Sequence, residues 1–303
     1  MNYIKGLVSV IMPTYKRSDK LLRAIDSVLN QTYKNLELLL VNDNEPFDEY
    51  TEQLKKRVEK YSDDKRFNLI IQQKHVNGAV ARNVGIHQAK GQYIAFLDDD
   101  DWWEENKLEE QVKVLESLDD SWGAVSCKFT LYDLNGNVIG KTKKYRDGYI
   151  YKDILNLMSD VATGTLLLRH DYFDTTRYFD ENLIRHQDLQ LLVDFTSKYK
   201  LKEVDEYLHC VDVSDTQNRP DAQKLIEYKK AFFKSIKPIM DSLSHRDRQC
   251  IYAMHKYELG YVCLKNGARD QGLMYCKSIL KSPKACRLAF KKTVLKLMQI
   301  CKR

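Results

Sequence analysis

Residues 93–103 read YIAFLDDDDWW, an apolar segment that runs directly into four aspartates and two tryptophans. The apolar part, residues 93–97, is typical of a buried strand. Carboxylates this close repel one another, and the repulsion favours a cation beside them. Mn²⁺ or Mg²⁺ suits such a run, because an ion of this kind binds one or two carboxylates together with the phosphates of a substrate. The alternative, a solvated acidic turn that begins a helix, explains the position at a strand end less well.

The residues before this run alternate between strand and helix patterns. Strands are predicted at residues 8–12, 37–41 and 67–71, where apolar side chains are nearly continuous. Helices are predicted from Ser18 or Asp19 to Asn30, at residues 50–61 and from Asn77 onward. Strands that alternate with helices are joined by right-handed crossovers and form a mainly parallel, doubly wound sheet. The predicted fold class is therefore α/β.

Polar residues follow three of the predicted strands at the point where each strand ends. Thr14 and Tyr15 follow the first strand, residues 42–44 (NDN) the second and residues 98–101 the fourth. In doubly wound sheets, ligands bind beyond the carboxyl ends of the strands. We therefore expect the three polar groups to form one site.

The second half of the chain changes character at residues 219 and 220. Strand patterns at residues 123–132 and 164–168 precede this point, whereas only helix patterns follow Pro220. We predict an α/β domain at residues 1–219 and a helical region at residues 220–303.

The C-terminal end of the chain is strongly basic. The net charge is +6, yet nine lysines and arginines and no acidic residue follow Asp270, so the rest of the chain is slightly acidic. On a helix that begins at Ala285, apolar side chains form one stripe: Cys286, Phe290, Val294, Leu297 and Cys301. This stripe could pack on the protein's own helices or enter an anionic membrane surface. A nucleic-acid partner is not indicated, because the charge is confined to the tail and no known module is present.

Cysteine content and hydropathy favour a cytoplasmic protein, which the basic tail could bring to the inner face of the membrane. The seven cysteines include no C-x-x-C pair, which favours free thiols over a zinc site. No stretch approaches the ~20 apolar residues of a membrane span. The first residues, MNYIKGLVSVIMPTY, include no small-residue cleavage site of the kind that ends a signal peptide.

Three segments together resemble the family 2 glycosyltransferases of the GT-A fold: residues 8–43, 77–101 and 178–192. The resemblance spans residues 8–195 and implies a Rossmann-like, doubly wound mixed sheet with a helical C-terminal extension. It also implies an inverting enzyme of the hexosyltransferase type. Such an enzyme would move a sugar from a nucleotide diphosphate donor, here a UDP-sugar, to a hydroxyl of a glycan or lipid-linked acceptor. Capsule, lipopolysaccharide or exopolysaccharide synthesis would be its setting.

The resemblance implies a donor site residue by residue. Pro13, Thr14 and Tyr15 would border the base and the ribose, and Asp43 would pair with the uracil ring. Arg82 would face the diphosphate or orient the acidic run, since a planar guanidinium suits phosphate. Each residue has a simpler explanation: Thr14 could end a strand, Asp43 could lie in a turn and Arg82 could lie on a helix surface.

The resemblance also places the metal and the catalytic base. Asp98 and Asp100 match the outer residues of the D-x-D motif. Asp100 would bind Mn²⁺ or Mg²⁺, with Asp98 as a second candidate ligand and with Asp98 and Asp99 beside the ribose and the waters of the metal. Asp188 would take the proton from the acceptor hydroxyl. Gln187 replaces a common acid before it and leaves the placement of the acceptor open, and Asp188 could instead be an acid favoured by a helix N-terminus.

Other interpretations stay open at this point. His209 could contact the metal or a phosphate, although a structural role is more usual for a single histidine. The alternative function is a catalytically degenerate subunit or scaffold, which Gln187 and the helical region would suit. Nucleotidyl transfer is less compatible, because residues 13–18 (PTYKRS) contain no glycine for a phosphate loop.

Overall fold

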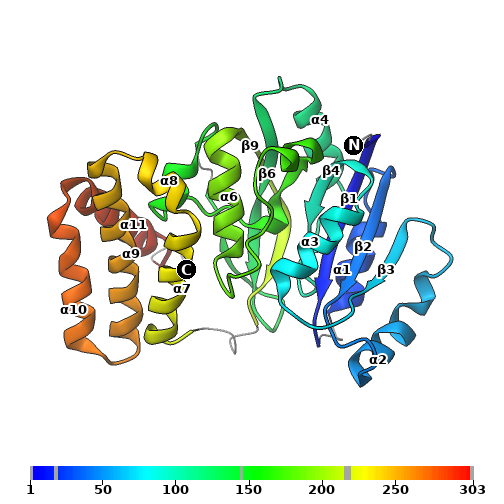
Figure 1. Ribbon diagram of the computed structural model, residues 1–303, viewed down its shortest axis with the longest axis horizontal. Helices are drawn as coiled ribbons and strands as arrows, with labels where there is room; N and C mark the ends of the chain where they lie inside the picture. Colours follow the sequence, from blue (N-terminus) through cyan, green and yellow to red (C-terminus); the bar gives the residue numbers. More distant parts are fainter. Residues whose placement is uncertain (1–2, 17–19, 144–145, 215–219, 301–303) are drawn as a thin grey trace.

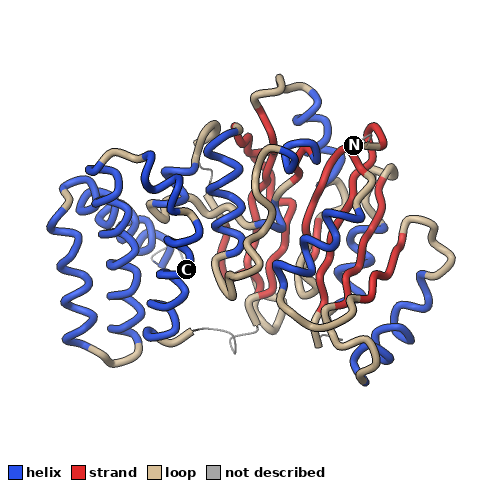
Figure 2. The backbone as a smooth tube through the Cα atoms, viewed as in Figure 1, coloured by secondary structure: helices blue, strands red, loops and turns tan. Residues whose placement is uncertain are grey.

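The computed structural model describes residues 3–16, 20–143, 146–214 and 220–300, and the side chains of residues 294–300 lie outside this description. Within these residues a nine-stranded mixed sheet forms the centre of the molecule, as Figures 1 and 2 show. Helices cover both faces of the sheet. A group of helices from the C-terminal part lies at one end of the molecule, beyond the helix α6 (Gln187–Lys198) and far from the sheet edge at β3 (Phe67–Ile71).

The sheet combines a parallel half with a half that contains both parallel and antiparallel pairs. Its remaining strands are β1 (Ile4–Thr14), β2 (Leu36–Asn42), β4 (Gly91–Phe96), β5 (Trp102–Trp103), β6 (Trp122–Tyr132), β7 (Val138–Lys141), β8 (Leu167–Arg169) and β9 (Lys200–Asp212). The order is β3-β2-β1-β4-β8-β6-β9-β5, with β7 paired to β6. The first four strands in this order are parallel, and β8 is antiparallel to its neighbours β4 and β6. The predicted doubly wound mixed sheet is confirmed.

Two apolar cores lie on opposite faces of this sheet. One face packs on α1 (Leu21–Leu29), α2 (Glu49–Val58) and α4 (Lys107–Glu116). The other packs on α3 (Gly78–Gln88), α5 (Tyr151–Leu155) and α6. Short 3₁₀ turns complete this part of the chain: η1 (Glu59–Tyr61), η2 (Thr163–Thr165) and η3 (His170–Asp174). Every residue of β2 is buried, as a strand covered on both faces requires.

Some elements differ from the predicted bounds. Pro13 does not end β1, because pairing with β2 continues to Thr14 and Asn42. The strand predicted at residues 164–168 begins only at Leu167, since Gly164 lies in η2. There a Cβ atom would meet the ring of His209 at 2.6 Å, so only glycine fits. Ser18 and Asp19, the predicted caps of the first helix, lie outside the described residues.

Helix α3 lies tightly against the parallel half of the sheet. Its N-cap residue Asn77 accepts hydrogen bonds through Oδ1 from the backbone of Ala79 at 2.9 Å and Val80 at 3.1 Å. A Cβ atom at Gly85 would lie 2.4 Å from Ile11, so glycine is what allows the close approach to β1. Because α3 follows β3, its N-terminus lies at the carboxyl ends of the parallel strands, where the polar residues gather.

The helical region is joined to the α/β part by a shared core. Its helices are α7 (Ala222–Ser235), α8 (Lys237–Ser242), α9 (His245–Lys265), α10 (Arg269–Lys277) and α11 (Pro283–Ile300), with η4 (Ser278–Lys281) before α11. Phe232, Met240 and Ile251 of α7, α8 and α9 belong to the same apolar cluster as α3 and α6. The predicted boundary at residues 219 and 220 falls partly outside the described residues and stays a prediction.

Helix α11 packs through small residues and leaves basic residues exposed. Ala285 and Ala289 are buried against Met254 of α9 and its neighbours. Phe290, a member of the predicted apolar stripe, is 72% exposed. The side chains of Val294 and Leu297, and all of Cys301, lie outside the described residues. Within the described part of the chain, no helix has the length and apolar character needed to cross a bilayer.

A lysine is completely buried behind the acidic run. The Lys107 ammonium donates a hydrogen bond to Gln111 Oε1 at 2.7 Å and lies 3.9 Å from the centre of the Trp103 ring. Burial lowers the pKa of Lys107 from 10.5 to about 8. Lys107 therefore binds its proton more tightly in the unfolded chain than in the folded chain. The free-energy cost of burying the charged lysine is greatest below pH 8, and it disappears above pH 10.5.

We predict that Lys107→Met stabilises the protein at pH 7 by about 1–2 kcal/mol, the lost desolvation cost less the lost bond to Gln111. Because the lysine of the unfolded chain loses its proton at high pH, the gain should shrink between pH 8 and pH 10.5. Chemical denaturation at pH 7 and pH 10 measures both values. Lys113→Met, on the exposed side of α4, is the control. Equal destabilisation by Lys107→Met at both pH values would contradict the prediction.

Candidate functional site

The four aspartates alternate between buried and partly exposed positions. Asp99 is 7% exposed, and its Oδ2 accepts a hydrogen bond from the Thr14 hydroxyl at 2.7 Å. Asp101, also 7% exposed, accepts a hydrogen bond from the Asp212 backbone at 2.9 Å. Asp98 and Asp100 are partly exposed. Two carboxylates of the run thus stabilise the loop, and the other two are the ones placed to meet a ligand.

Arg82 of α3 offsets the charge of the first aspartate. Its Nη2 donates to Asp98 Oδ1 at 2.5 Å, and its Nη1 donates to the Gly78 carbonyl at 3.3 Å. Its Nε atom is buried and has no hydrogen-bond partner among the described residues. An arginine held in this way at a helix N-terminus is suited to receive an anion such as a diphosphate.

A divalent ion fits this arrangement. No group of three or more His, Cys, Asp or Glu side chains that could hold a metal occurs within the described part of the chain. Mn²⁺ and Mg²⁺ do not require one, because substrate phosphates and water complete their coordination. Asp98 and Asp100, partly exposed and two positions apart, would be the protein's share of the ligands.

His209 lies behind the acidic run in a structural position. Its ring is 1% exposed, and Nε2 lies 3.3 Å from Asp101 Oδ2. The ring also fills the space that Gly164 leaves open. These contacts place His209 under the loop, where it supports Asp101 and not the partly exposed carboxylates.

Two basic side chains of the α1 segment, which the sequence did not single out, also support the acidic loop. Arg23 donates to the Asp100 carbonyl at 2.7 Å and lies 3.8 Å from the centre of the Trp102 ring. Lys20 and Arg23 form ion pairs with Asp212 at 2.8 Å and 3.2 Å. Burial alone would raise the pKa of Asp212, but these hydrogen bonds hold it well below its usual range. Nothing in residues 16–23 distinguishes these cations from surface charges before the fold is known.

Asp43 lies in a second polar cluster at the ends of β1 and β2. Its Oδ1 accepts hydrogen bonds from Gln72 Nε2 at 2.8 Å and from the Val76 backbone at 3.2 Å. His75 Nδ1 lies 3.2 Å from Asp43 Oδ2. Burial raises the pKa of Asp43, and the hydrogen bonds counteract only part of that effect. The carboxylate is thus fixed by three neighbours from the segment that follows β3.

An aromatic stack closes this cluster. The Tyr15 ring stacks on the His75 ring with centroids 4.0 Å apart. Pro13 pairs with Val41 in the neighbouring strand β2. The structure therefore brings the predicted base-binding residues together, and it adds His75, which no motif had indicated.

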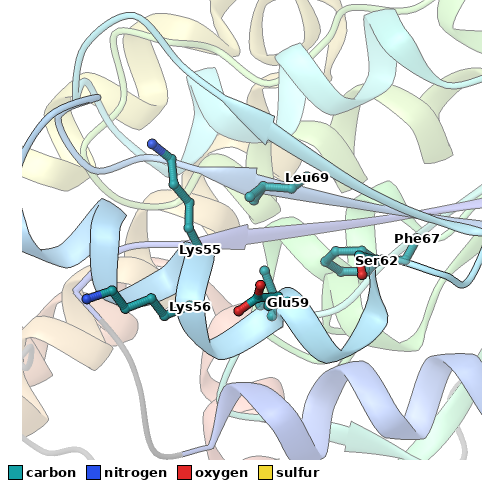
Figure 3. A pocket seen from close by; sticks show the side chains of 7 residues that line it. Lys55, Lys56, Glu59, Ser62, Phe67 and Leu69 are labelled. Atoms are coloured by element: carbon teal, nitrogen blue, oxygen red, sulfur yellow. The ribbon is translucent and has the colours of Figure 1, made fainter.

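Among the hollows in the described part of the surface are two of similar volume, and the smaller one lies beside this cluster. Its volume is about 420 Å³, and its lining includes Gln72 and Val76, which hold Asp43. The larger hollow, about 480 Å³, lies between α2 and β3 (Figure 3). Its lining contains none of the candidate residues: Lys55, Lys56, Val58, Glu59, Ser62, Phe67 and Leu69. Position at the carboxyl ends of the strands is a better guide than volume, so we assign no role to the larger hollow.

The first turn of α6, which carries Asp188, lies beside the N-terminus of α3 through Gln187. Asp188 is exposed, whereas Gln187 is buried and its amide nitrogen donates a hydrogen bond to the Leu183 carbonyl. Gln187 Oε1 lies 3.8 Å from the position that a Cβ of Gly78 would take, and Arg82 Nη1 lies 3.0 Å from the same point. A glutamate, which has no N–H, could not donate to Leu183. This hydrogen bond gives a local structural reason for glutamine at position 187.

Asn83 holds the segment before α6 against α3. Its Nδ2 donates to the Phe179 carbonyl and to Glu181 Oε1, both at 2.9 Å. Its Oδ1 accepts from the Phe179 backbone at 3.1 Å. Asn77 adds a bond from Nδ2 to the Glu181 carbonyl at 2.9 Å. Asn83 was not among the predicted site residues, although its place beside Arg82 was a signal that could have drawn attention to it.

Residues 9–176 match glycosyl transferase family 2. The chain belongs to this family. The glycosyltransferase is 28% identical over 264 residues to the amylovoran biosynthesis glycosyltransferase AmsB of Erwinia amylovora, covering 83% of this chain and 82% of that protein. It is also 28% identical to the putative teichuronic acid biosynthesis glycosyltransferase TuaG of Bacillus subtilis, over 73% of this chain and 85% of that protein.

Solved structures share the fold of this glycosyltransferase. TarS 1–349 of Staphylococcus aureus, in complex with UDP-GlcNAc, has a TM-score of 0.60 at 15% identity and covers 89% of each chain. The mannosyltransferase PcManGT of Pyrobaculum calidifontis, in complex with GDP-Man and Mn²⁺, has a TM-score of 0.60 at 18% identity. That match covers 96% of this chain and 80% of PcManGT. At these identities the likeness concerns the fold alone.

We predict that Asn83→Ala lowers the free energy of unfolding by about 2 kcal/mol, because it leaves the buried backbone groups of Phe179 unpaired. The exposed neighbour Gln88→Ala should change it by less than about 0.5 kcal/mol. Urea denaturation of both variants beside the wild type makes the measurement. Equal stability of the two variants would show that water or another residue replaces the Asn83 amide.

Proposed function

We propose that this glycosyltransferase moves a sugar, with inversion, from a UDP-sugar to a hydroxyl of a glycan or lipid-linked acceptor, with Mn²⁺ or Mg²⁺ as cofactor. The observation that carries the proposal is the meeting of α3 and α6. Arg82, paired with Asp98, and Gln187, next to Asp188, approach the same point at Gly78. In this proposal Arg82 would serve the diphosphate, and Asp188, one position after Gln187, would act as the base on the α6 side.

The donor side of the proposal uses the clusters at the ends of the parallel strands. Tyr15 and Asp43 would meet the base, while Pro13, Thr14 and Asp99 would border the ribose through the ends of β1 and β4. Thr14 and Asp99 bond to each other, so their contribution would be to shape this wall. The ligands of TarS and PcManGT, UDP-GlcNAc and GDP-Man with Mn²⁺, support a nucleotide-sugar donor and a metal. Between uracil and guanine, the resemblance at Asp43 favours uracil.

The chemistry assigns one proton transfer and one displacement to the site. Asp188 accepts the proton of the acceptor hydroxyl while that oxygen forms a bond to the anomeric carbon. The bond from the anomeric carbon to the diphosphate breaks on the opposite side, and the electron pair leaves with the diphosphate. Arg82 would stabilise the charge that develops there. A metal bound at Asp98 and Asp100 would offset part of the same charge.

The names of the relatives suggest the setting. AmsB is named for amylovoran and TuaG for teichuronic acid. A surface polysaccharide such as capsule, lipopolysaccharide or exopolysaccharide is therefore the product class we favour. The scaffold alternative gains no support from Gln187, because the glutamine has a local hydrogen bond and Asp188 is exposed beside it.

Calorimetric titration of UDP tests the donor site. We predict binding with Mn²⁺, weakened at least about tenfold by a chelator, and loss of the Mn²⁺ effect in Asp100→Ala. Asp188→Asn is the matched control, since it removes a carboxylate from the acceptor side and should bind UDP as the wild type does. The same variant should release UDP from a UDP-sugar at least about 100-fold more slowly.

Each part of the proposal has its own contrary outcome. Binding of GDP instead of UDP would indicate a GDP-sugar as the donor. If no nucleoside diphosphate binds, the scaffold function would be favoured. Unchanged UDP release by Asp188→Asn would remove Asp188 as the base.

The exposed basic side of α11 supports a peripheral location on the inner face of the membrane. Arg287, Phe290 and Lys291 are all exposed on α11. An exposed Phe290 ring between two cationic side chains suits contact with a membrane surface that contains anionic lipid. This would bring a cytoplasmic enzyme close to a lipid-linked acceptor.

Sedimentation with phosphatidylglycerol vesicles tests this contact. We predict that Arg287→Glu with Lys291→Glu weakens binding at least about tenfold, because each cation near an anionic surface contributes about 1 kcal/mol. Lys5→Glu with Lys34→Glu changes the net charge equally at exposed sites of the α/β part and should have little effect. Equal loss in both double variants, or no binding by the wild type, would contradict the proposed contact.

A further inference from the structure

A buried polar cluster connects the helical region to the α/β part. Lys229 of α7 is 4% exposed, and its ammonium donates to His255 Nδ1 at 2.9 Å and to Glu258 of α9. His255 Nε2 lies 3.0 Å from the Leu155 carbonyl of α5, so Nε2 carries the proton and Nδ1 is the acceptor. Burial and the neighbouring Lys229 cation lower the pKa of His255, which keeps the ring neutral. The buried Lys229 cation is therefore paired with Glu258, and His255 links it to the backbone of α5.

His186 lies between this cluster and the candidate base. It is the N-cap residue of α6, with a left-handed backbone conformation at φ 66°. Its carbonyl accepts the Gln190 backbone N–H at 2.9 Å, the bond that begins the helix. Its ring meets the Phe232 ring of α7 edge to face, with centroids 5.7 Å apart. Nε2 is buried and has no hydrogen-bond partner among the described residues. Since a left-handed histidine is uncommon, the surroundings must hold this conformation.

Charged groups from three elements act on the His186 ring. Burial first and then the Lys229 cation lower the pKa of His186 to about 4, with Arg185 acting in the same direction. Asp188 and Glu258 oppose this change. The ring is therefore neutral near pH 7.

We infer that His186 is a positioning residue. Phe232 of α7 lies against its ring, and Lys229 holds His255 on the other side of Phe232, so that the helical region fixes the first turn of α6 as it presents Asp188 to the site. The helical region would then be part of the transferase machinery. The inference rests on the proposed function only for the role of Asp188. The contacts among α6, α7 and α9 stand without it.

Hydrogen exchange on the full chain, read by mass spectrometry, tests the inference. We expect Lys229→Met and His186→Asn each to speed exchange of the amides of residues 190–193 by about tenfold, because the first turn of α6 opens more often. Asparagine tolerates the left-handed conformation, so His186→Asn removes the ring and keeps the backbone. Lys230→Met, an exposed lysine one position along α7, should leave this exchange unchanged.

A functional measurement separates positioning from a merely structural role. In both variants UDP binding should equal that of the wild type, while kcat for UDP release from a UDP-sugar falls about tenfold or more. The double variant should lose little beyond either single variant, because both changes act on one turn.

Unchanged exchange at residues 190–193 in both variants would overturn the inference. So would faster exchange confined to α7 and α9. His186→Asn leaves the pair of Lys229 and Glu258 intact, so the test stays decisive if Lys229→Met does not fold. If the wild type binds no UDP, the proposed function is contradicted. The exchange measurement would still show whether His186 and Lys229 hold the first turn of α6.

Discussion

The Asn83 amide meets the Phe179 backbone with both a donor and an acceptor, and the candidate site depends on this contact. Asn83 lies on α3 one position after Arg82, which pairs with Asp98. Phe179 begins the segment that leads to α6 and Asp188. Because the amide is buried, its bonds compete little with water and are costly to break. Together with Asn77, which bonds the Glu181 carbonyl, this side chain fixes the segment before α6 against the helix that carries Arg82.

The acidic run shows how one loop can serve stability and ligand binding together. Asp99 and Asp101 are buried and hydrogen-bonded, and Arg82 neutralises part of the charge on Asp98. The repulsion among four carboxylates is therefore relieved by the protein's own donors. A metal ion would offset the remaining negative charge, which lies on the partly exposed Asp98 and Asp100. Donor phosphates would complete its coordination, so metal and donor would bind together.

The helical region is bound to the rest of the molecule by an apolar core and by a buried cation. Phe232 contributes to both, since it belongs to the core shared with α6 and its ring lies beside His255, which accepts a hydrogen bond from Lys229. Lys229 is paired with Glu258 and would be expensive to bury alone. A change in α7 should therefore be felt at the first turn of α6, more than at the donor side near Asp43.

Local patterns in the sequence predicted the α/β class, the strands at residues 37–41 and 67–71, and the grouping of Thr14, Asp43 and Asp98. These follow from apolar runs and from the rule that parallel strands end at one edge, which need no knowledge of distant contacts. Nothing in the sequence indicated His75 as part of the site or Lys229 as part of its support, and Asn83 was indicated only by its place beside Arg82. Their roles arise from partners far along the chain, such as Phe179 for Asn83. The same holds for Gly164, where a side chain would clash with the ring of His209. Such contacts are decided only when the folded chain brings these residues together.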